Sequence, residues 1–344
     1  MLELKRGNLL AEKTDALVNT VNCVGVMGKG IALQFKQTFP DNFKQYKKAC
    51  DAGEVVPGKM FIVPTGNLFN PRYIINFPTK HHWRGKSKLE DIQSGLVDLV
   101  AQVQRLEIGA IAIPPLGCGN GGLDWAVVRP LIEEAFTPLQ AVQVVLFEPG
   151  KAPAADQLVV NTKLPNMTRG RALVVSLFDR YGKPGYRLGK LEAQKLAYFL
   201  QVSGEPLRLA YKKYKYGPYA DNLNHVLQHI DGHYIRGYGD RNQRSEMYVL
   251  PEGRQKAAAS LASHTNAHSR LEQVAQLIEG FETPYGMEML ATLHWVATQE
   301  NPNAAVDVEE AIKAVHGWSD RKRNLFKPSH LRKAWQRLQE QGWF

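Results

Sequence analysis

Apolar and polar residues follow two different patterns along the first 150 residues. Short apolar runs rich in β-branched residues predict buried strands at 16–19, 59–64, 73–77, 110–114 and 142–147. Between them, apolar residues recur every three or four positions, which predicts helices at 30–39, 41–52, 88–106 and 124–136. Strands that alternate with helices indicate βαβ units. We therefore expect a three-layer α/β fold with a mainly parallel sheet that is covered on both faces.

The second half of the chain has a different pattern. Helical spacing dominates it, at 190–202, 220–230, 254–261, 271–279, 287–298, 306–315 and 328–341, and residues 247–250 are its clearest strand candidate. The change follows residues 148–156, a stretch of Pro, Gly and Ala without a large apolar side chain. The pattern thus predicts two domains, an α/β domain over residues 1–155 and a mostly α-helical domain over residues 160–344.

Composition narrows the class of protein. The chain has 344 residues, of which 44% are hydrophobic and 22% charged, so collagen, low-complexity disorder and a coiled-coil rod are excluded. No apolar run approaches the roughly 20 residues that span a bilayer, and charge stands where a signal peptide would be apolar. We expect a cytoplasmic protein with no membrane partner. The three cysteines form no CxxC pair, which predicts packing residues rather than disulfides or a metal site.

Positive charge is concentrated in the second domain. Residues 1–155 contain 17 Lys and Arg against 14 Asp and Glu, and the remaining residues contain 26 against 19. The net charge of +10 favours a polyanionic partner such as nucleic acid. A generically basic surface explains it equally well.

Two glycine-rich segments each follow a predicted strand. They are NTVNCVGVMGKGIA at 19–32 and PLGCGNGGLDW at 115–125. Glycine lets the backbone approach a ligand closely, and N–H groups ahead of a helix bind phosphate. Neither segment is a Walker loop or the GxGxxG of a dinucleotide fold. Because parallel strands end at one edge of a sheet, the pair predicts a phosphate-binding site there.

The order RGNLL, DALVNTVNCVGVMGKGIA and GCGNGGLDW resembles the macrodomain family, three-layer α/β/α modules that bind ADP-ribose. The resemblance covers about residues 1–150. Within that family it is closest to glycohydrolases that remove ADP-ribose from nucleobases or carboxylates, because NFPTKHHW at 76–83 looks like the stretch that carries their catalytic lysine. With its helical domain, the chain resembles DarG-type antitoxins, which are paired with the DNA ADP-ribosylating toxin DarT.

The resemblance implies roles for particular residues. Lys80 would be the nucleophile, Asn22 would hold the distal ribose, and residues 25–31 and 117–122 would bind the diphosphate. The implied ligand-binding residues are Asn8, Leu9, Asn22, Val24, Gly25, Val26, Met27, Gly28, Gly30, Ile31, Pro115, Leu116, Gly117, Cys118, Gly119, Asn120, Gly121 and Gly122.

The chain departs from the family pattern at two places. Asn8 stands where the family often has an aspartate that accepts a hydrogen bond from adenine, so only a neutral acceptor is available. Gly121 stands where related hydrolases carry a catalytic aspartate. The general acid or base is therefore unassigned.

Chemistry independently limits what Lys80 can do. A lysine is nucleophilic at neutral pH only if burial or nearby positive charge lowers its pKa, and Lys80 follows an apolar strand beside His81, His82 and Arg84. Without the resemblance it reads as a surface residue at a strand end. The histidine pair lacks a carboxylate or cysteine at metal-ligand spacing, so we expect no zinc site.

Two other residues near the second glycine segment invite a chemical role. Asp124 precedes a helix and is interpreted as its N-terminal cap rather than the missing acid. Cys118 is interpreted as a packing residue rather than a nucleophile.

The second domain contains a tyrosine- and lysine-rich segment, YKKYKYGPY at 211–219. Such a segment suits single-stranded nucleic acid, and inward packing of the tyrosines is at least as good an explanation. The stretch KLEAQKLAYFLQ at 190–201 resembles a small helical antitoxin domain that grips toxin proteins.

The leading hypothesis is an antitoxin enzyme that hydrolyses ADP-ribose from thymidine bases of DNA, without a cofactor, and binds its cognate DarT-like toxin through residues 160–344. Its partners would be ADP-ribose, ADP-ribosylated DNA and that toxin. One alternative is a non-catalytic ADP-ribose-binding module, and another is a DNA-binding regulator that uses the basic helical half.

Overall fold

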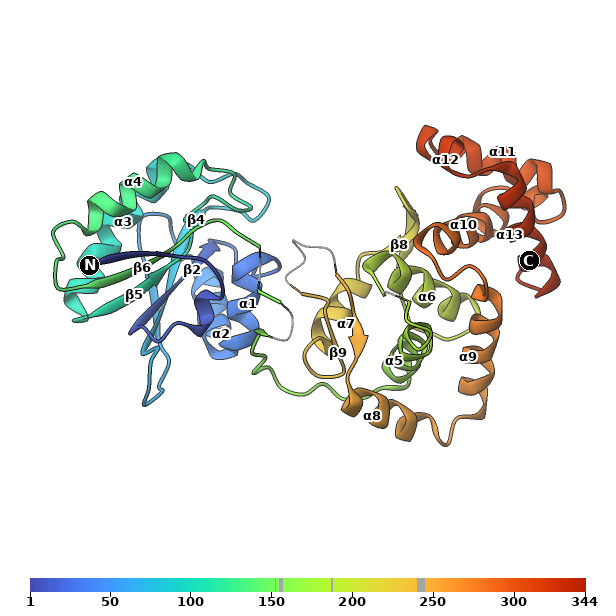
Figure 1. Ribbon diagram of the computed structural model, residues 1–344, viewed down its shortest axis with the longest axis horizontal. Helices are drawn as coiled ribbons and strands as arrows, with labels where there is room; N and C mark the ends of the chain where they lie inside the picture. The colour runs from blue at the N-terminus through green and yellow to red at the C-terminus, as the bar shows by residue number, and fades with distance from the viewer. Residues whose placement is uncertain (152, 155–156, 187, 240–244) are drawn as a thin grey trace. The chain divides into compact units, whose positions relative to one another are not determined.

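The computed structural model describes residues 1–344 except 152, 155–156, 187 and 240–244 (Figure 1). Residue contacts divide the described chain into two compact units on either side of the Lys163–Leu164 bond. The expected boundary at 148–156 includes residues 152, 155 and 156, which lie outside the described residues.

The first unit is built on a six-stranded sheet. Its strands are β1 (Leu2–Lys5), β2 (Ala16–Asn22), β3 (Phe61–Pro64), β4 (Tyr73–Lys80), β5 (Ala110–Ile113) and β6 (Gln143–Phe147). They lie in the order β1-β6-β5-β2-β4-β3, and every neighbouring pair is parallel except β3 with β4. The expected mainly parallel α/β sheet is confirmed.

Four helices cover the two faces of this sheet: α1 (Gly30–Thr38), α2 (Pro40–Asp51), α3 (Leu89–Arg105) and α4 (Trp125–Phe136) (Figure 1). Alternate strand residues point to opposite faces, so Ile75 and Phe77 pack with α3 and α4, whereas Leu17 packs with Phe35 of α1. The ring of Phe77 fills the space where Gly95 of α3 would carry a Cβ. Burial on both faces explains the nearly continuous apolar runs of the strands.

The strand β1 was not expected from the sequence. All four of its residues are exposed, with Leu2 at 37% and Leu4 at 39%, because β1 is an edge strand that pairs with β6 alone. An exposed edge strand leaves little hydrophobic signal.

Register places the glycine-rich segments together. Strands β2, β4 and β5 are adjacent and parallel, and Asn22 at the end of β2 pairs with Lys80 at the end of β4. A register shift between Val21 and Asn22 turns the chain out of the sheet there. The loops after these three strands therefore leave from one edge.

The second unit is mostly helical, as expected. Its helices are α5 (Arg169–Gly182), α6 (Lys190–Val202), α7 (Leu223–Ile230), α8 (Pro251–Leu261), α9 (Thr265–Ile278), α10 (Pro284–Trp295), α11 (Val308–Trp318), α12 (Asp320–Leu325) and α13 (Pro328–Glu340). Two small hairpins join them, β7 (Tyr211–Tyr214) with β8 (Gly217–Ala220) and β9 (Ile235–Arg236) with β10 (Tyr248–Val249). Among the described residues, no helix is long and apolar enough to cross a membrane.

Two elements of this unit differ from expectation. The helix α5 was missed because its run ALVVSLF is apolar all round, and periodicity cannot distinguish a buried helix from a strand in such a run. The segment YKKYKYGPY, for which no strand was predicted, forms the β7–β8 hairpin, and its backbone pairs from Tyr211 with Ala220 to Tyr214 with Gly217.

Candidate active site

Lys80 lies at the carboxyl end of β4 between two loops. Its Nζ donates hydrogen bonds to the backbone oxygen of Gly85, at 3.4 Å, and to that of Asn120, at 3.2 Å. Gly85 belongs to the loop that follows Lys80, and Asn120 belongs to the second glycine segment. A neutral amine has two N–H groups and one lone pair, so two carbonyl acceptors can hold both N–H groups and leave the lone pair available.

Electrostatics favour the neutral form of this amine. Partial burial lowers the pKa of Lys80, and the positive charge of Lys86 lowers it further. Lys86 Nζ lies against the second glycine segment, since a Cβ built on Gly122 would be 2.9 Å from it. The sequence had suggested His81, His82 and Arg84 as the positive neighbours, and Lys86 was missed because it comes close only when the loop folds back.

His81 and His82 are exposed, and His82 Nδ1 accepts a hydrogen bond from the backbone N–H of Arg84. In the part of the chain that the structure describes, no group of three or more His, Cys, Asp or Glu side chains could hold a metal ion.

Asn22 shapes the first glycine segment. Its Oδ1 accepts hydrogen bonds from the N–H groups of Val24 and Val26, and its Nδ2 donates to the Val26 oxygen at 2.6 Å. The hydroxyl of Tyr46 donates to the backbone oxygen of Asn22 at 2.5 Å. Asn22 is thus buried and committed to the loop, with one amide N–H left for a ligand.

The remaining residues of the first glycine segment divide into exposed and buried positions. Val24 and Val26 are exposed, and Gly28 is half-buried, whereas Met27 is only 2% exposed and packs with Tyr46. Gly25 and Gly30 have φ of +71° and +59°, a conformation that favours glycine. Gly25 and Gly30 are buried in the turn, and Ile31 is half-buried at the start of α1.

The second glycine segment is held by its own backbone. Cys118 N–H donates to Pro115, Gly122 N–H to Gly119, and Leu123 N–H to Gly117. The N–H of Ser87 donates to Gly121 at 3.1 Å, which joins this segment to the loop after Lys80. Gly119, Asn120 and Gly122 are exposed, Pro115 is half-buried, and Leu116 is buried in the core.

Gly121 has no room for a side chain. A Cβ there would overlap the Gly117 oxygen and the Ser87 hydroxyl. An aspartate, which the resemblance implied for this position, could not occupy it without a rearrangement of the loop. Asp124 caps α4 by accepting from Ala126 N–H, which confirms the capping interpretation.

Cys118 is half-buried against the core, and burial raises the pKa of its thiol to about 11. A thiol with a raised pKa carries little thiolate at neutral pH. The interpretation of Cys118 as a packing residue therefore agrees with its environment.

Asn8 and Leu9 lie after β1, at the far end of the strand order from Lys80. Asn8 Oδ1 accepts from Leu10 N–H, and its Nδ2 donates to the Gln157 oxygen. Leu9 is 3% exposed and packs in the core. The side chains of Leu9, Met27 and Leu116 are buried in the core, so these residues can contribute to a ligand site only through their backbone atoms.

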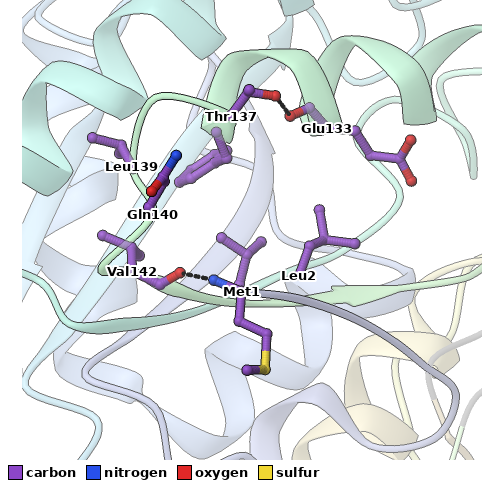
Figure 2. A pocket seen from close by; sticks show the side chains of 9 residues that line it. Met1, Leu2, Glu133, Thr137, Leu139, Gln140 and Val142 are labelled. Atoms are coloured by element: carbon purple, nitrogen blue, oxygen red, sulfur yellow. Dashed lines mark hydrogen bonds between the residues drawn. The ribbon is translucent and has the colours of Figure 1, made fainter.

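A pocket of about 510 Å³ lies at the opposite edge of the sheet, at the amino ends of β1 and β6 (Figure 2). The amino group of Met1 donates to Val142 there, at 2.9 Å. The pocket lies at the amino ends of parallel strands and the glycine segments lie at the carboxyl ends, so the length of the strands separates them. It is no part of the candidate site.

A buried polar cluster in the second unit fixes the β7–β8 hairpin. Glu288 is 2% exposed and forms ion pairs with Arg321 and Lys322. Lys195 Nζ donates to the Pro218 oxygen of β8 at 2.7 Å. Burial, with the nearby charge of Lys322, lowers the pKa of Lys195 to about 7.

The hairpin exposes two of its four tyrosines. Tyr214 is 54% and Tyr216 40% exposed, whereas Tyr211 and Tyr219 are half-buried. The rings of Tyr214 and Tyr219 stack at 5.1 Å, and Trp318 Nε1 donates to the Tyr214 oxygen. Figure 1 shows the hairpin projecting beyond α6. Inward packing therefore applies in part to Tyr211 and Tyr219, and contact between this segment and single-stranded nucleic acid stays a prediction.

Comparison with known proteins finds one matching family and several relatives that share a description. The Macro domain family matches residues 18–132. The "DNA ADP-ribosyl glycohydrolase" of Thermus aquaticus is 46% identical over 342 residues, covering 99% of this chain and 94% of that protein. The Mycobacterium tuberculosis protein of the same description is 41% identical over 354 residues, covering 98% and 99%.

Two further relatives match less than half of the chain. A Thermosipho africanus "DNA ADP-ribosyl transferase-DNA ADP-ribosyl glycohydrolase fusion protein" is 35% identical over 161 residues, covering 42% of each chain. The solved "Macrodomain of Mycobacterium tuberculosis DarG" is 55% identical with a TM-score of 0.43, covering 44% of this chain and 99% of that one.

Proposed function

The chain belongs to the DarG-type family of DNA ADP-ribosyl glycohydrolases, and from this premise we propose that it removes ADP-ribose from thymidine bases of DNA and binds the transferase that attaches it. Its relatives match it over nearly the full length, so it is a glycohydrolase. The observation that carries the mechanism is Lys80, an amine with a lowered pKa held between two loops.

In this proposal the two glycine segments bind the diphosphate of ADP-ribose. Gly28, Gly119 and Gly122 are at least partly accessible, and their lack of side chains lets a ligand approach the backbone. The segments precede α1 and α4, so their N–H groups and the helix amino ends favour an anion. Asn22 acts chiefly by holding the first segment in shape.

Lys80 then attacks the anomeric carbon of the distal ribose. A bond forms between Nζ and that carbon, the glycosidic bond to the base breaks, and its electron pair leaves with the base nitrogen. The new bond gives Nζ a positive charge, so Nζ releases one proton, and the base nitrogen takes up one proton. Water subsequently hydrolyses the ribosyl–lysine adduct and releases ADP-ribose. The Lys86 ammonium stabilises negative charge that develops near Lys80, and after burial it is the second cause that lowers the pKa of the attacking amine.

A module that only binds ADP-ribose is the second candidate. Such a module needs no nucleophile, whereas Lys80 Nζ lies between two loops at the carboxyl end of β4. This position and the near-full-length relatives described as glycohydrolases favour the hydrolase over the reader.

The choice of base can be tested with matched substrates. We expect an oligonucleotide with ADP-ribose on a thymine ring nitrogen to be hydrolysed at least about a hundredfold faster than one with ADP-ribose on the exocyclic amine of guanine. The imide nitrogen of thymine carries the released electron pair better than an amine nitrogen does. The measurement is single-turnover release of ADP-ribose; equal rates would refute thymidine specificity.

The second unit is proposed to bind the toxin. It has its own large hydrophobic core, and its β7–β8 hairpin presents Tyr214, Lys215 and Tyr216 from a fixed base. Exposed tyrosines held in place are typical of protein interfaces, because large rings are buried there with little loss of entropy. The transferase fused to a relative supports an association of the two activities.

Binding of the transferase toxin should therefore not depend on the catalytic activity of the first unit. We expect full-length Lys80→Ala to bind the cognate transferase with native affinity, and Tyr214→Ala with Tyr216→Ala to weaken binding at least about tenfold. Tyr248→Ala is the control, because Tyr248 is 51% exposed on β10 and outside the hairpin. Calorimetry with the purified transferase measures both. A Lys80→Ala protein that no longer binds would remove this division of roles.

A further inference from the structure

In the mechanism above, the loop at 81–88, HHWRGKSK, contributes Lys86 and the backbone oxygen of Gly85, and its other exposed side chains have no role although the loop begins directly after the nucleophile. It leaves the end of β4 at Lys80 and returns to the start of α3. Every residue in it is exposed except Ser87. Such exposure beside an active site invites a partner.

The backbone of this loop is fixed. Gly85 N–H donates to His82 at 2.9 Å, and Ser87 N–H donates to Gly121 of the second glycine segment. Lys80 Nζ holds the Gly85 oxygen. The exposed side chains are therefore presented from a rigid base, which lowers the entropy cost of binding.

Two rings and a cation form the outer surface of the loop. Trp83 is 45% exposed, the Arg84 guanidinium lies 4.5 Å from its ring centroid, and the His82 ring lies 5.4 Å away. A flat, exposed aromatic and guanidinium surface can stack with a nucleobase, and any base has a π face that it can use.

Basic side chains predominate within the loop. Residues 81–88 contain no Asp or Glu, whereas Arg84, Lys86 and Lys88 fall within five positions, and the nearest acidic residues, Glu90 and Asp91, follow in the first turn of α3. All three basic side chains are exposed. Phosphates of a nucleic acid backbone are the complementary partner.

Strand order decides which part of the substrate lies here. The adenine is expected at Asn8, which follows β1 at one edge of the sheet. Lys80 ends β4, and the strands β6, β5 and β2 lie between β1 and β4. The loop at 81–88 begins directly after Lys80, so it lies next to the expected position of the reacting ribose and its base and several strands away from Asn8. We therefore expect this surface to face DNA rather than the adenosine of ADP-ribose.

We propose that loop 81–88 binds the single DNA strand that flanks the modified base, with an unpaired neighbouring base stacked on Trp83 and backbone phosphates contacting Arg84 and Lys88. This proposal rests on the proposed function in taking DNA as the substrate. It makes Trp83 a determinant of preference for a DNA strand over a lone nucleoside.

The test compares one scissile bond in two settings: ADP-ribosylated thymidine as the mononucleoside and the same nucleotide within a single-stranded oligonucleotide. For full-length Trp83→Ala, we expect the KM of the oligonucleotide to rise about tenfold and the kinetics of the mononucleoside to stay unchanged. Arg84→Ala should also reduce the salt dependence of the oligonucleotide KM, by about 0.7 in the log–log slope.

Phe69→Ala is the matched control, because Phe69 is 83% exposed in the segment before β4, at the opposite edge of the sheet. Equal losses on both substrates, or no loss on either, would overturn the proposal. Fluorescence anisotropy of an unmodified oligonucleotide measures DNA binding without hydrolysis, so it tests the DNA-binding surface separately from the proposed function. Trp83-dependent binding by a chain that hydrolyses neither substrate would uphold this surface and remove the hydrolase mechanism.

Discussion

Lys80→Ala is expected to slow release of ADP-ribose from modified thymidine by about a thousandfold or more, about 4 kcal/mol in activation free energy. The substitution removes the amine that forms the bond to the anomeric carbon. Affinity for free ADP-ribose should change only a few-fold. The hydrogen bonds from Lys80 to Gly85 and Asn120 are long and exposed, and the second glycine segment is held by separate backbone bonds.

Single-turnover release and calorimetry with ADP-ribose measure the two quantities. Lys80→Arg should fail equally, since a guanidinium keeps its proton. Near-native hydrolysis by Lys80→Ala would show that an activated water, rather than this amine, attacks the ribose.

The pH profile provides a separate readout of the same role. The neutral amine is the nucleophile, so the rate should rise with pH as Lys80 loses its proton and level off above its pKa, which burial and Lys86 lower. Removing the neighbouring charge in Lys86→Gln raises the pKa of Lys80, so the rising limb should move to higher pH. An unchanged profile in Lys86→Gln would contradict the electrostatic role of Lys86.

Gly119→Phe is expected to weaken ADP-ribose binding by at least about a hundredfold, about 2.8 kcal/mol. The position is exposed, no atom lies within 4 Å of where its Cβ would be, and its φ is not in the left-handed region. A Cβ can therefore be added there without a clash, and the exposed position leaves the side chain free to extend away from the core. The ring would fill the space that the proposed diphosphate site needs.

The melting temperature without ligand should stay unchanged, and the thermal shift with ADP-ribose should disappear. Gly317→Phe is the control, because Gly317 is exposed on α11 of the other unit and has nothing within 4 Å of its Cβ position. Native affinity in Gly119→Phe would mean that this segment is a turn rather than a binding site.

The α/β domain was largely predictable because burial of its strands and helices leaves a pattern within each short stretch of the sequence. Strands buried on both faces produce continuous apolar runs, as in YIINF, and helices that cover them produce a 3.6-residue period. The elements without such a signal were missed. The edge strand β1 is exposed, and the central run of α5, ALVVSLF, has no 3.6-residue period because it is almost entirely apolar.

The site was predictable in its parts and not in its contacts. The sequence alone indicated two glycine segments, a lysine after a buried strand and the family that combines them. Only the tertiary structure decided that Lys86 lies beside Lys80, that Ser87 bonds to Gly121, and that Asn22 is committed to its own loop. Periodicity reports which face of an element is buried. Contacts between loops depend on which strands become neighbours and in what register, and here the parallel pairing of β2 with β4 brings residues 58 positions apart into one site.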